Sequence, residues 1–140
     1  MLDKDRILSK IDELRSYLRE LRSIAPKDYL VYVSNLEKKR ACERLLQIMI
    51  ECVIDICLLL VKGLELGLPS EESDLFKKLK EARVIDEEME EKLKRMKGFR
   101  NILVHRYGEI DDEIVFENLQ KLGDFEDFIN EILNFIKRQE

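Results

Sequence analysis

The sequence has 140 residues, of which 45% are hydrophobic and 39% are charged, and its formal net charge at pH 7 is −5. This length and composition are typical of one folded domain and argue against an intrinsically disordered chain, so we expect a single domain over residues 1–140. The negative net charge argues against a surface coated with positive charge for non-specific nucleic-acid binding. An RNA site therefore has to be a local basic patch.

In chain order, every predicted element is a helix. Hydrophobic residues at helical spacing predict an amphipathic helix over residues 2–24, which Ala25-Pro26 ends. A second helix is predicted from about Lys27 to about Leu66, with a bend at Ser34-Asn35. Its second half is apolar nearly all round, so it has to be covered on several sides. Either it is the central helix of one chain, or two copies share it.

Particular segments argue against a membrane protein, a metal protein and a secreted protein. The most apolar stretch, residues 45–61, is shorter than the ~20 residues that a membrane span requires, and its two carboxylates would cost ~2.5–3.5 kcal/mol each in a bilayer. The three cysteines, Cys42, Cys52 and Cys57, form no C-x-x-C pair and have no histidine nearby, so we expect no metal site and no disulfide framework. Since the charged N-terminus carries no signal peptide, a cytoplasmic protein with reduced core cysteines is expected.

Polar residues on the second helix are not scattered. Arg44, Gln47, Glu51 and Asp55 follow one another at steps of three, four and four, which places them in one stripe. Two interpretations remain open. The stripe is either a partly solvated seam with an internal ion pair or a polar wall that faces the basic segment of the fourth helix.

Capping and charge signals predict the third and fourth helices. Ser70 or Ser73 is expected to cap a third helix that ends near Arg83. Asp86 is expected to cap a fourth helix, which starts acidic and ends basic, in agreement with the helix dipole, and stops at Gly108.

A fifth helix is predicted to open at Asp111 or Asp112 and to carry hydrophobic residues as far as Ile136. Residues 29–33 resemble a strand locally, but a single strand has nothing to pair with, so they are assigned to the second helix. The predicted fold is therefore all-α: a single-domain bundle of about five helices around a long, buried second helix.

The only histidine, His105, lies in the most informative segment of the chain, R-N-I-L-V-H-R-Y at residues 100–107. Residues 92–108 contain no acidic residue and six basic ones: Lys92, Lys94, Arg95, Lys97, Arg100 and Arg106. In an acidic protein such a cluster attracts anions. A purely structural interpretation remains open, because basic residues and a lone histidine are also favoured at helix C-termini.

Helical geometry separates the side chains of this segment. Arg100 lies on the apolar face of the predicted helix, where a charge needs a partner or an interface. Gly98, Asn101 and His105 share a different face, and Gly98 leaves a notch that a second backbone or a ligand could approach. Arg100 and His105 are about 140° apart on an ideal helix. They can reach one phosphate if the last turn loosens before Gly108, or if two copies meet across a dimer.

The segment R-N-I-L-V-H-R-Y resembles the R-x4-H-x-Y signature of HEPN-superfamily ribonucleases, specifically the HepT-like toxins. The resemblance rests on the spacing of the arginine and the histidine, on Asn101, on Tyr107 and on the position of the motif at the end of a late helix. It extends over essentially the whole chain in helix order. It implies a metal-independent endoribonuclease with no cofactor, usually a homodimer with two motif copies in a cleft between protomers.

The resemblance also implies roles for the motif residues. His105 would act in acid–base chemistry on the RNA 2′-hydroxyl or the leaving oxygen. Arg100 would stabilise charge on the phosphate, and Asn101 would orient the histidine or the substrate. Because the chain has one histidine, a second acid or base would come from the other protomer or from a carboxylate such as Glu51.

The family further implies a protein partner. HepT-like toxins are paired with a minimal nucleotidyltransferase antitoxin, which can adenylylate the motif tyrosine and so block RNA binding. Tyr107 matches that position, and AMP there would place negative charge where an RNA phosphate should bind; without the family match, it would be assigned as a packing aromatic at a helix end. Two other functions stay open: a non-catalytic HEPN module that binds nucleotide or the nucleotidyltransferase, and a plain helical dimerisation domain.

Overall fold

The computed structural model describes residues 1–105 and 110–140, which contain helices and no strands, so the predicted all-α fold is confirmed. These residues form α1 (Lys4–Ile24), α2 (Tyr29–Ser34), α3 (Leu36–Gly63), α4 (Glu72–Glu81), α5 (Glu87–His105), α6 (Asp112–Leu119) and α7 (Gly123–Arg138). Residues 29–33, which resemble a strand in sequence, are helical as predicted.

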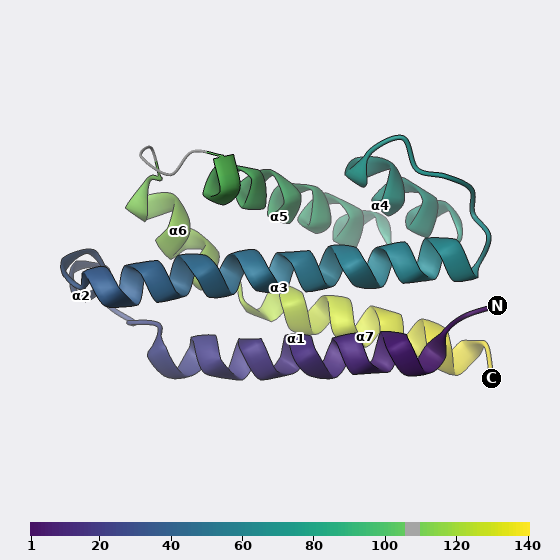
Figure 1. Ribbon diagram of the computed structural model, residues 1–140, viewed down its shortest axis with the longest axis horizontal. Helices are drawn as coiled ribbons and strands as arrows, with labels where there is room; N and C mark the ends of the chain where they lie inside the picture. The colour runs from purple at the N-terminus through teal and green to yellow at the C-terminus, as the bar shows by residue number, and fades with distance from the viewer. Residues whose placement is uncertain (106–109) are drawn as a thin grey trace.

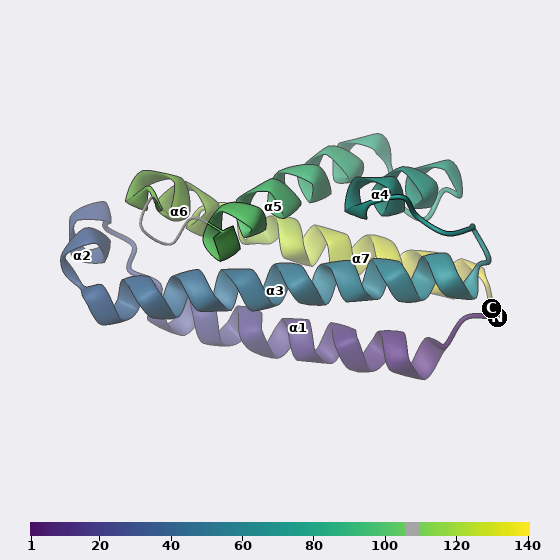
Figure 2. The same cartoon turned by 45° about the horizontal axis from the view of Figure 1, so that its top comes forward.

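The long helices form an antiparallel bundle. Figure 1 shows α3 running along the whole molecule, with α1 on one side of it and α4, α5 and α6 on the other. Helices α1 and α5 run in one direction, and α3 and α7 run in the opposite one (Figures 1 and 2). The two termini lie at the same end, where the Met1 amino group donates to the Gly63 carbonyl oxygen at 2.8 Å and Lys4 pairs with Glu140.

Helix α3 is the centre of the core. Twelve of its residues are buried, and all of these except Glu43 belong to one hydrophobic cluster with buried side chains from the other six helices described. The helices of a single chain therefore cover α3, as the first of the two predicted arrangements requires. No helix within residues 1–105 and 110–140 combines the length and the apolar character that a membrane crossing needs.

The three cysteines lie buried on α3 and are free thiols, as predicted. Burial raises the pKa of the Cys42 thiol and of the Cys52 thiol to about 11 each. Complete burial also raises the pKa of Cys57. These thiols stay protonated near neutral pH, so they serve as small apolar core residues and not as nucleophiles.

Two of the predicted helices are each divided in two. At Asn35, α2 ends and α3 begins, because the Asn35 side chain accepts a hydrogen bond from the Lys38 backbone N–H at 3.0 Å and so caps α3. The expected bend is thus a break. The predicted fifth helix opens with Asp111 as its cap, as expected, but a turn over residues 120–122 separates α6 from α7. The hydrophobic pattern continues through that turn, so it carried no sign of the break.

The predicted serine cap of the third helix is wrong. Helix α4 follows Glu71, which makes no capping hydrogen bond with its side chain. Ser73 lies inside α4, where its hydroxyl donates to the Glu71 carboxylate, and Ser70 precedes Glu71, so neither serine occupies the cap position. The helix ends at Glu81, close to the predicted end, and Arg83 follows in the left-handed region with φ of 61°.

Candidate functional site

Helix α5 carries the predicted site at its C-terminal end. Asp86 starts the helix by accepting a hydrogen bond from the Met89 backbone N–H at 2.8 Å, as the sequence predicts. One face is buried against the core, through Met89, Leu93, Met96, Phe99 and Leu103. Because the apolar face anchors the helix, the side chains between these positions are held toward solvent or toward the neighbouring helices.

Gly98, Asn101 and His105 lie on the outer face of α5. Gly98 and His105 are exposed and Asn101 is half-buried. A Cβ atom placed on Gly98 would meet nothing within 4 Å, so the helix backbone is open to close approach at this point.

Arg100 lies in a different environment, between α3 and α4. Its side chain is only 15% exposed. Its Nη2 donates to the Glu72 carboxylate, and its Nη1 is 4.0 Å from Oε2 of Glu51. The Nε atom is buried and has no hydrogen-bond partner in the described part of the chain. The charge on the apolar face therefore has the partner that helical geometry requires, and two carboxylates hold the guanidinium in place.

The predicted polar stripe of α3 divides between two neighbours. Gln47 donates to Glu51 at 3.3 Å, and Glu51 faces Arg100 of α5. Asp55 instead pairs with Lys10 of α1, with 3.6 Å between the charged atoms. Arg44 is exposed. The structure thus places Gln47 and Glu51 beside the candidate site, while Asp55, one turn further along the same stripe, pairs with α1, so the stripe combines features of both interpretations.

His105 and Arg100 point away from the helix in different directions. Helix α5 continues through His105, so no loosening occurs between the two residues. A step of five positions along a regular helix directs the two side chains about 140° apart. His105 makes no ion pair or hydrogen bond with residues 1–105 or 110–140. A single chain therefore presents Arg100 and His105 on two sides of one helix.

Arg106 and Tyr107 of the motif, and Gly108 after it, lie outside the described residues. The predicted modification of Tyr107 and the predicted helix stop at Gly108 both concern them. Within the described ranges, no group of three or more His, Cys, Asp or Glu side chains is arranged to hold a metal ion.

Glu72 is a site residue that the sequence analysis did not identify. It lies 28 positions before Arg100, in the first turn of α4, where an acidic residue is already explained by the helix dipole. No local signal separates an acid that only stabilises its own helix from one that also binds a distant arginine.

Proteins with nuclease names are similar to this chain in sequence. The chain is 39% identical over 88 residues to the mRNA nuclease HepT of Shewanella oneidensis, which covers 62% of this chain and 66% of that protein. It is 30% identical over 109 residues to the tRNA nuclease HepT of Aphanizomenon flos-aquae, which covers 78% of this chain and 72% of that protein. The chain spans about two thirds of the length of the curated relatives it matches.

The fold agrees with that of a toxin whose structure has been solved in a complex. The tri-AMPylated HEPN toxin of Shewanella oneidensis, in complex with MNT antitoxin, superposes with a TM-score of 0.86 at 30% identity, over 96% of this chain and 99% of that one. The family model described as Ribonuclease HepT-like matches residues 8–132, nearly the whole bundle including α5 and its motif. The protein therefore belongs to the HepT-like ribonuclease family.

Proposed function

We propose that this protein is a metal-independent endoribonuclease of the toxin class, built as one HEPN domain over residues 1–140 and acting in the cytoplasm. The observation that carries the proposal is the placement of the R-x4-H segment at the solvent-exposed end of α5 in a member of this family. Relatives named as mRNA and tRNA nucleases support RNA as the substrate.

His105 supplies the proton transfer in this proposal. The RNA 2′-oxygen forms a bond to phosphorus while the bond from phosphorus to the 5′-oxygen breaks. One proton leaves the 2′-hydroxyl and one reaches the departing 5′-oxygen. Because His105 is exposed, the substrate can approach it directly, and it makes one of these transfers. Asn101, one turn before it on the same face, orients the histidine or the substrate.

Arg100 stabilises the charge on the phosphate, and its placement favours a site shared by two copies. One regular helix directs Arg100 and His105 about 140° apart, so one chain does not aim both at the same atom. In a two-fold dimer, Arg100 of one copy and His105 of the other can converge on one phosphate. The second copy also supplies the second acid or base, for which Glu51 beside Arg100 is the other candidate.

A nucleotidyltransferase antitoxin is the proposed protein partner. The structural relative from Shewanella oneidensis is AMPylated and complexed with an MNT antitoxin. We assign Tyr107, which follows the histidine by two positions, as the residue that receives AMP. The added phosphate carries negative charge next to the catalytic histidine, so it repels the RNA backbone and inhibits cleavage.

One observation favours a second candidate function, a non-catalytic HEPN module. The Arg100 guanidinium is engaged by Glu72 and faces Glu51, so its positive charge is already balanced inside the protein. An arginine that only supports the fold would have this environment. Such a module would bind nucleotide or the antitoxin without cutting RNA.

RNA cleavage by unmodified protein in EDTA separates the two functions. Wild type is compared with His105→Ala and Arg100→Ala, after intact mass has excluded AMP adducts on each sample. We expect cleavage by wild type and rates roughly 100-fold lower for the folded variants. If all three proteins behave alike, the motif is not catalytic, and the non-catalytic module is the better assignment.

A further inference from the structure

A hollow lined by lysines lies between α4 and α5, the helix that carries the candidate site. Its volume is about 430 Å³, and Lys77 of α4 and Lys94 and Lys97 of α5 line it together with two serines and two acids. Helices α4 and α5 lie against each other here (Figure 2), and the pair between Arg100 and Glu72 joins the same two helices. The hollow is thus continuous with the elements that hold Arg100.

The acids of the hollow are already engaged, and two of its lysines are not. Glu71 accepts a hydrogen bond from Ser73, and Asp74 accepts one from the Ser70 backbone and lies 4.0 Å from Lys78. Within residues 1–105 and 110–140, neither acid forms an ion pair with a lysine that lines the hollow.

Lys94 is shared with acids of its own helix, since its Nζ lies 3.5 Å from Glu90 and 3.7 Å from Glu91. Lys77 and Lys97, in contrast, form no ion pair with any residue in 1–105 or 110–140. Lys77 and Lys97 are therefore the cations that an incoming anion would meet.

The register of α5 connects the hollow to His105. Lys97 is one turn before Asn101 and about two turns before His105, a rise of about 12 Å along the axis. Gly98 lies between them on the exposed face, with open space where a Cβ would be. An extended nucleic-acid backbone can therefore lie along α5, against the glycine, from the histidine to the lysines.

We propose that this hollow binds a backbone phosphate of single-stranded RNA, at a subsite away from the phosphate that is cut, with Lys77 and Lys97 as the direct ligands. The inference rests on the proposed ribonuclease function and names where its substrate runs. Because lysine binds phosphate as a point charge, the subsite adds affinity without selecting a base. It also explains how an acidic protein holds an anionic polymer: the charge is local, and it lies on the route to the histidine.

RNA binding by full-length His105→Ala protein tests the subsite, measured by fluorescence anisotropy with a labelled single-stranded oligonucleotide at several salt concentrations. Adding Lys77→Ala and Lys97→Ala should raise Kd roughly five- to tenfold and reduce the salt slope by about 0.7 for each lost contact. Lys77→Arg with Lys97→Arg should preserve both the Kd and the salt slope, because the positive charges remain.

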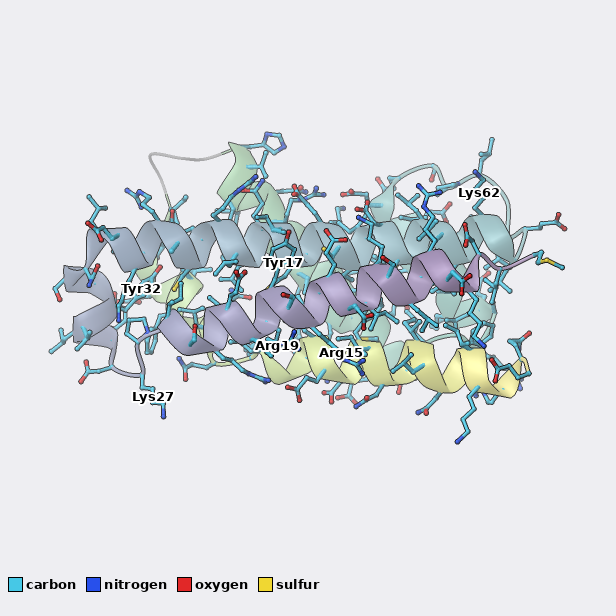
Figure 3. The ribbon with its side chains drawn as sticks, turned by 60° about the horizontal axis from the view of Figure 1, so that its bottom comes forward. Arg15, Tyr17, Arg19, Lys27, Tyr32 and Lys62 are labelled. Atoms are coloured by element: carbon cyan, nitrogen blue, oxygen red, sulfur yellow. The ribbon has the colours of Figure 1, made fainter. Side chains whose placement is uncertain are left out.

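The matched control removes two positive charges elsewhere. Arg15 and Arg19 line a separate hollow between α1 and α7, and Figure 3 shows them on that side of α1. Arg15→Ala with Arg19→Ala should change Kd less than twofold. If the arginine and lysine pairs weaken binding equally, the effect is one of net charge alone and the subsite is wrong.

Cleavage assays on the wild-type protein distinguish failure of the subsite proposal from failure of the ribonuclease proposal. If wild type cuts RNA but the two lysine substitutions leave Kd unchanged, the subsite is wrong and the ribonuclease stands. If wild type cuts nothing while the lysine pair still weakens binding selectively, the subsite stands as an RNA contact and the catalytic proposal fails.

Discussion

Arg100 and His105 belong to the same helix and the same sequence motif, yet their surroundings are opposite. Arg100 is 15% exposed and held by carboxylates from α3 and α4. His105, five residues later, is exposed at the last position of α5. The difference indicates that one half of the motif is tied to the fold and the other half is free to meet substrate. Activity and stability should therefore separate at these two positions.

His105→Ala should give the largest effect on activity and the smallest on stability. Loss of a general acid or base lowers the cleavage rate by roughly 100-fold or more. The free energy of unfolding should change by less than about 0.5 kcal/mol, because the side chain is exposed. Single-turnover cleavage and urea unfolding of the same samples measure both. Destabilisation well above that limit would show that His105 is a structural residue.

Arg100→Ala should lower both the cleavage rate and the free energy of unfolding. Its removal leaves Glu72 and Glu51 without their shared cation, which should cost about 1–3 kcal/mol of unfolding free energy. The cleavage rate should also fall by about 100-fold as phosphate stabilisation is lost. Arg100→Lys should recover part of the stability but less of the activity, because lysine lacks the planar fork of arginine. If Arg100→Ala were as stable as wild type, Arg100 would not be tied to the fold in the way that its contrast with His105 indicates.

A double-mutant cycle with Arg100→Ala and Glu72→Gln should give the smallest effect. The pair is partly exposed, so we expect a coupling free energy of about 0.5–1 kcal/mol that declines in 1 M salt. Glu51→Gln should couple more weakly to Arg100, because its carboxylate is 4.0 Å away and 40% exposed. A coupling of zero for Glu72 would mean that the ion pair does not hold Arg100.

Much of the site's layout on α5 could be predicted from the sequence. Apolar residues at helical spacing placed Arg100 on the apolar face and Gly98 and His105 on a different one, and in the structure Gly98 and His105 are exposed while Arg100 is not. The prediction works because a helix of 3.6 residues per turn relates spacing to direction without reference to the rest of the chain. The break at Asn35 was also visible as a bend, since asparagine is a favoured N-cap.

Contacts between helices were decided only by the tertiary structure. Arg100 needed a partner on general grounds, but its choice of Glu72 depends on how the connection between α3 and α4 places the first turn of α4. The division of the polar stripe, with Glu51 toward α5 and Asp55 toward α1, likewise depends on which helices flank α3. The break between α6 and α7 falls within a continuous hydrophobic pattern.

The sequence by itself therefore determined the all-α class, the separation of Arg100 and His105 onto different faces of α5 and the motif that identifies the family. The tertiary structure alone decided which carboxylates hold Arg100 and where lysines from two helices form one hollow. The physical reason is the distance along the sequence over which each feature arises. Helical periodicity is a local property of the chain, whereas an ion pair or a hollow between helices arises from packing of segments that are distant in sequence.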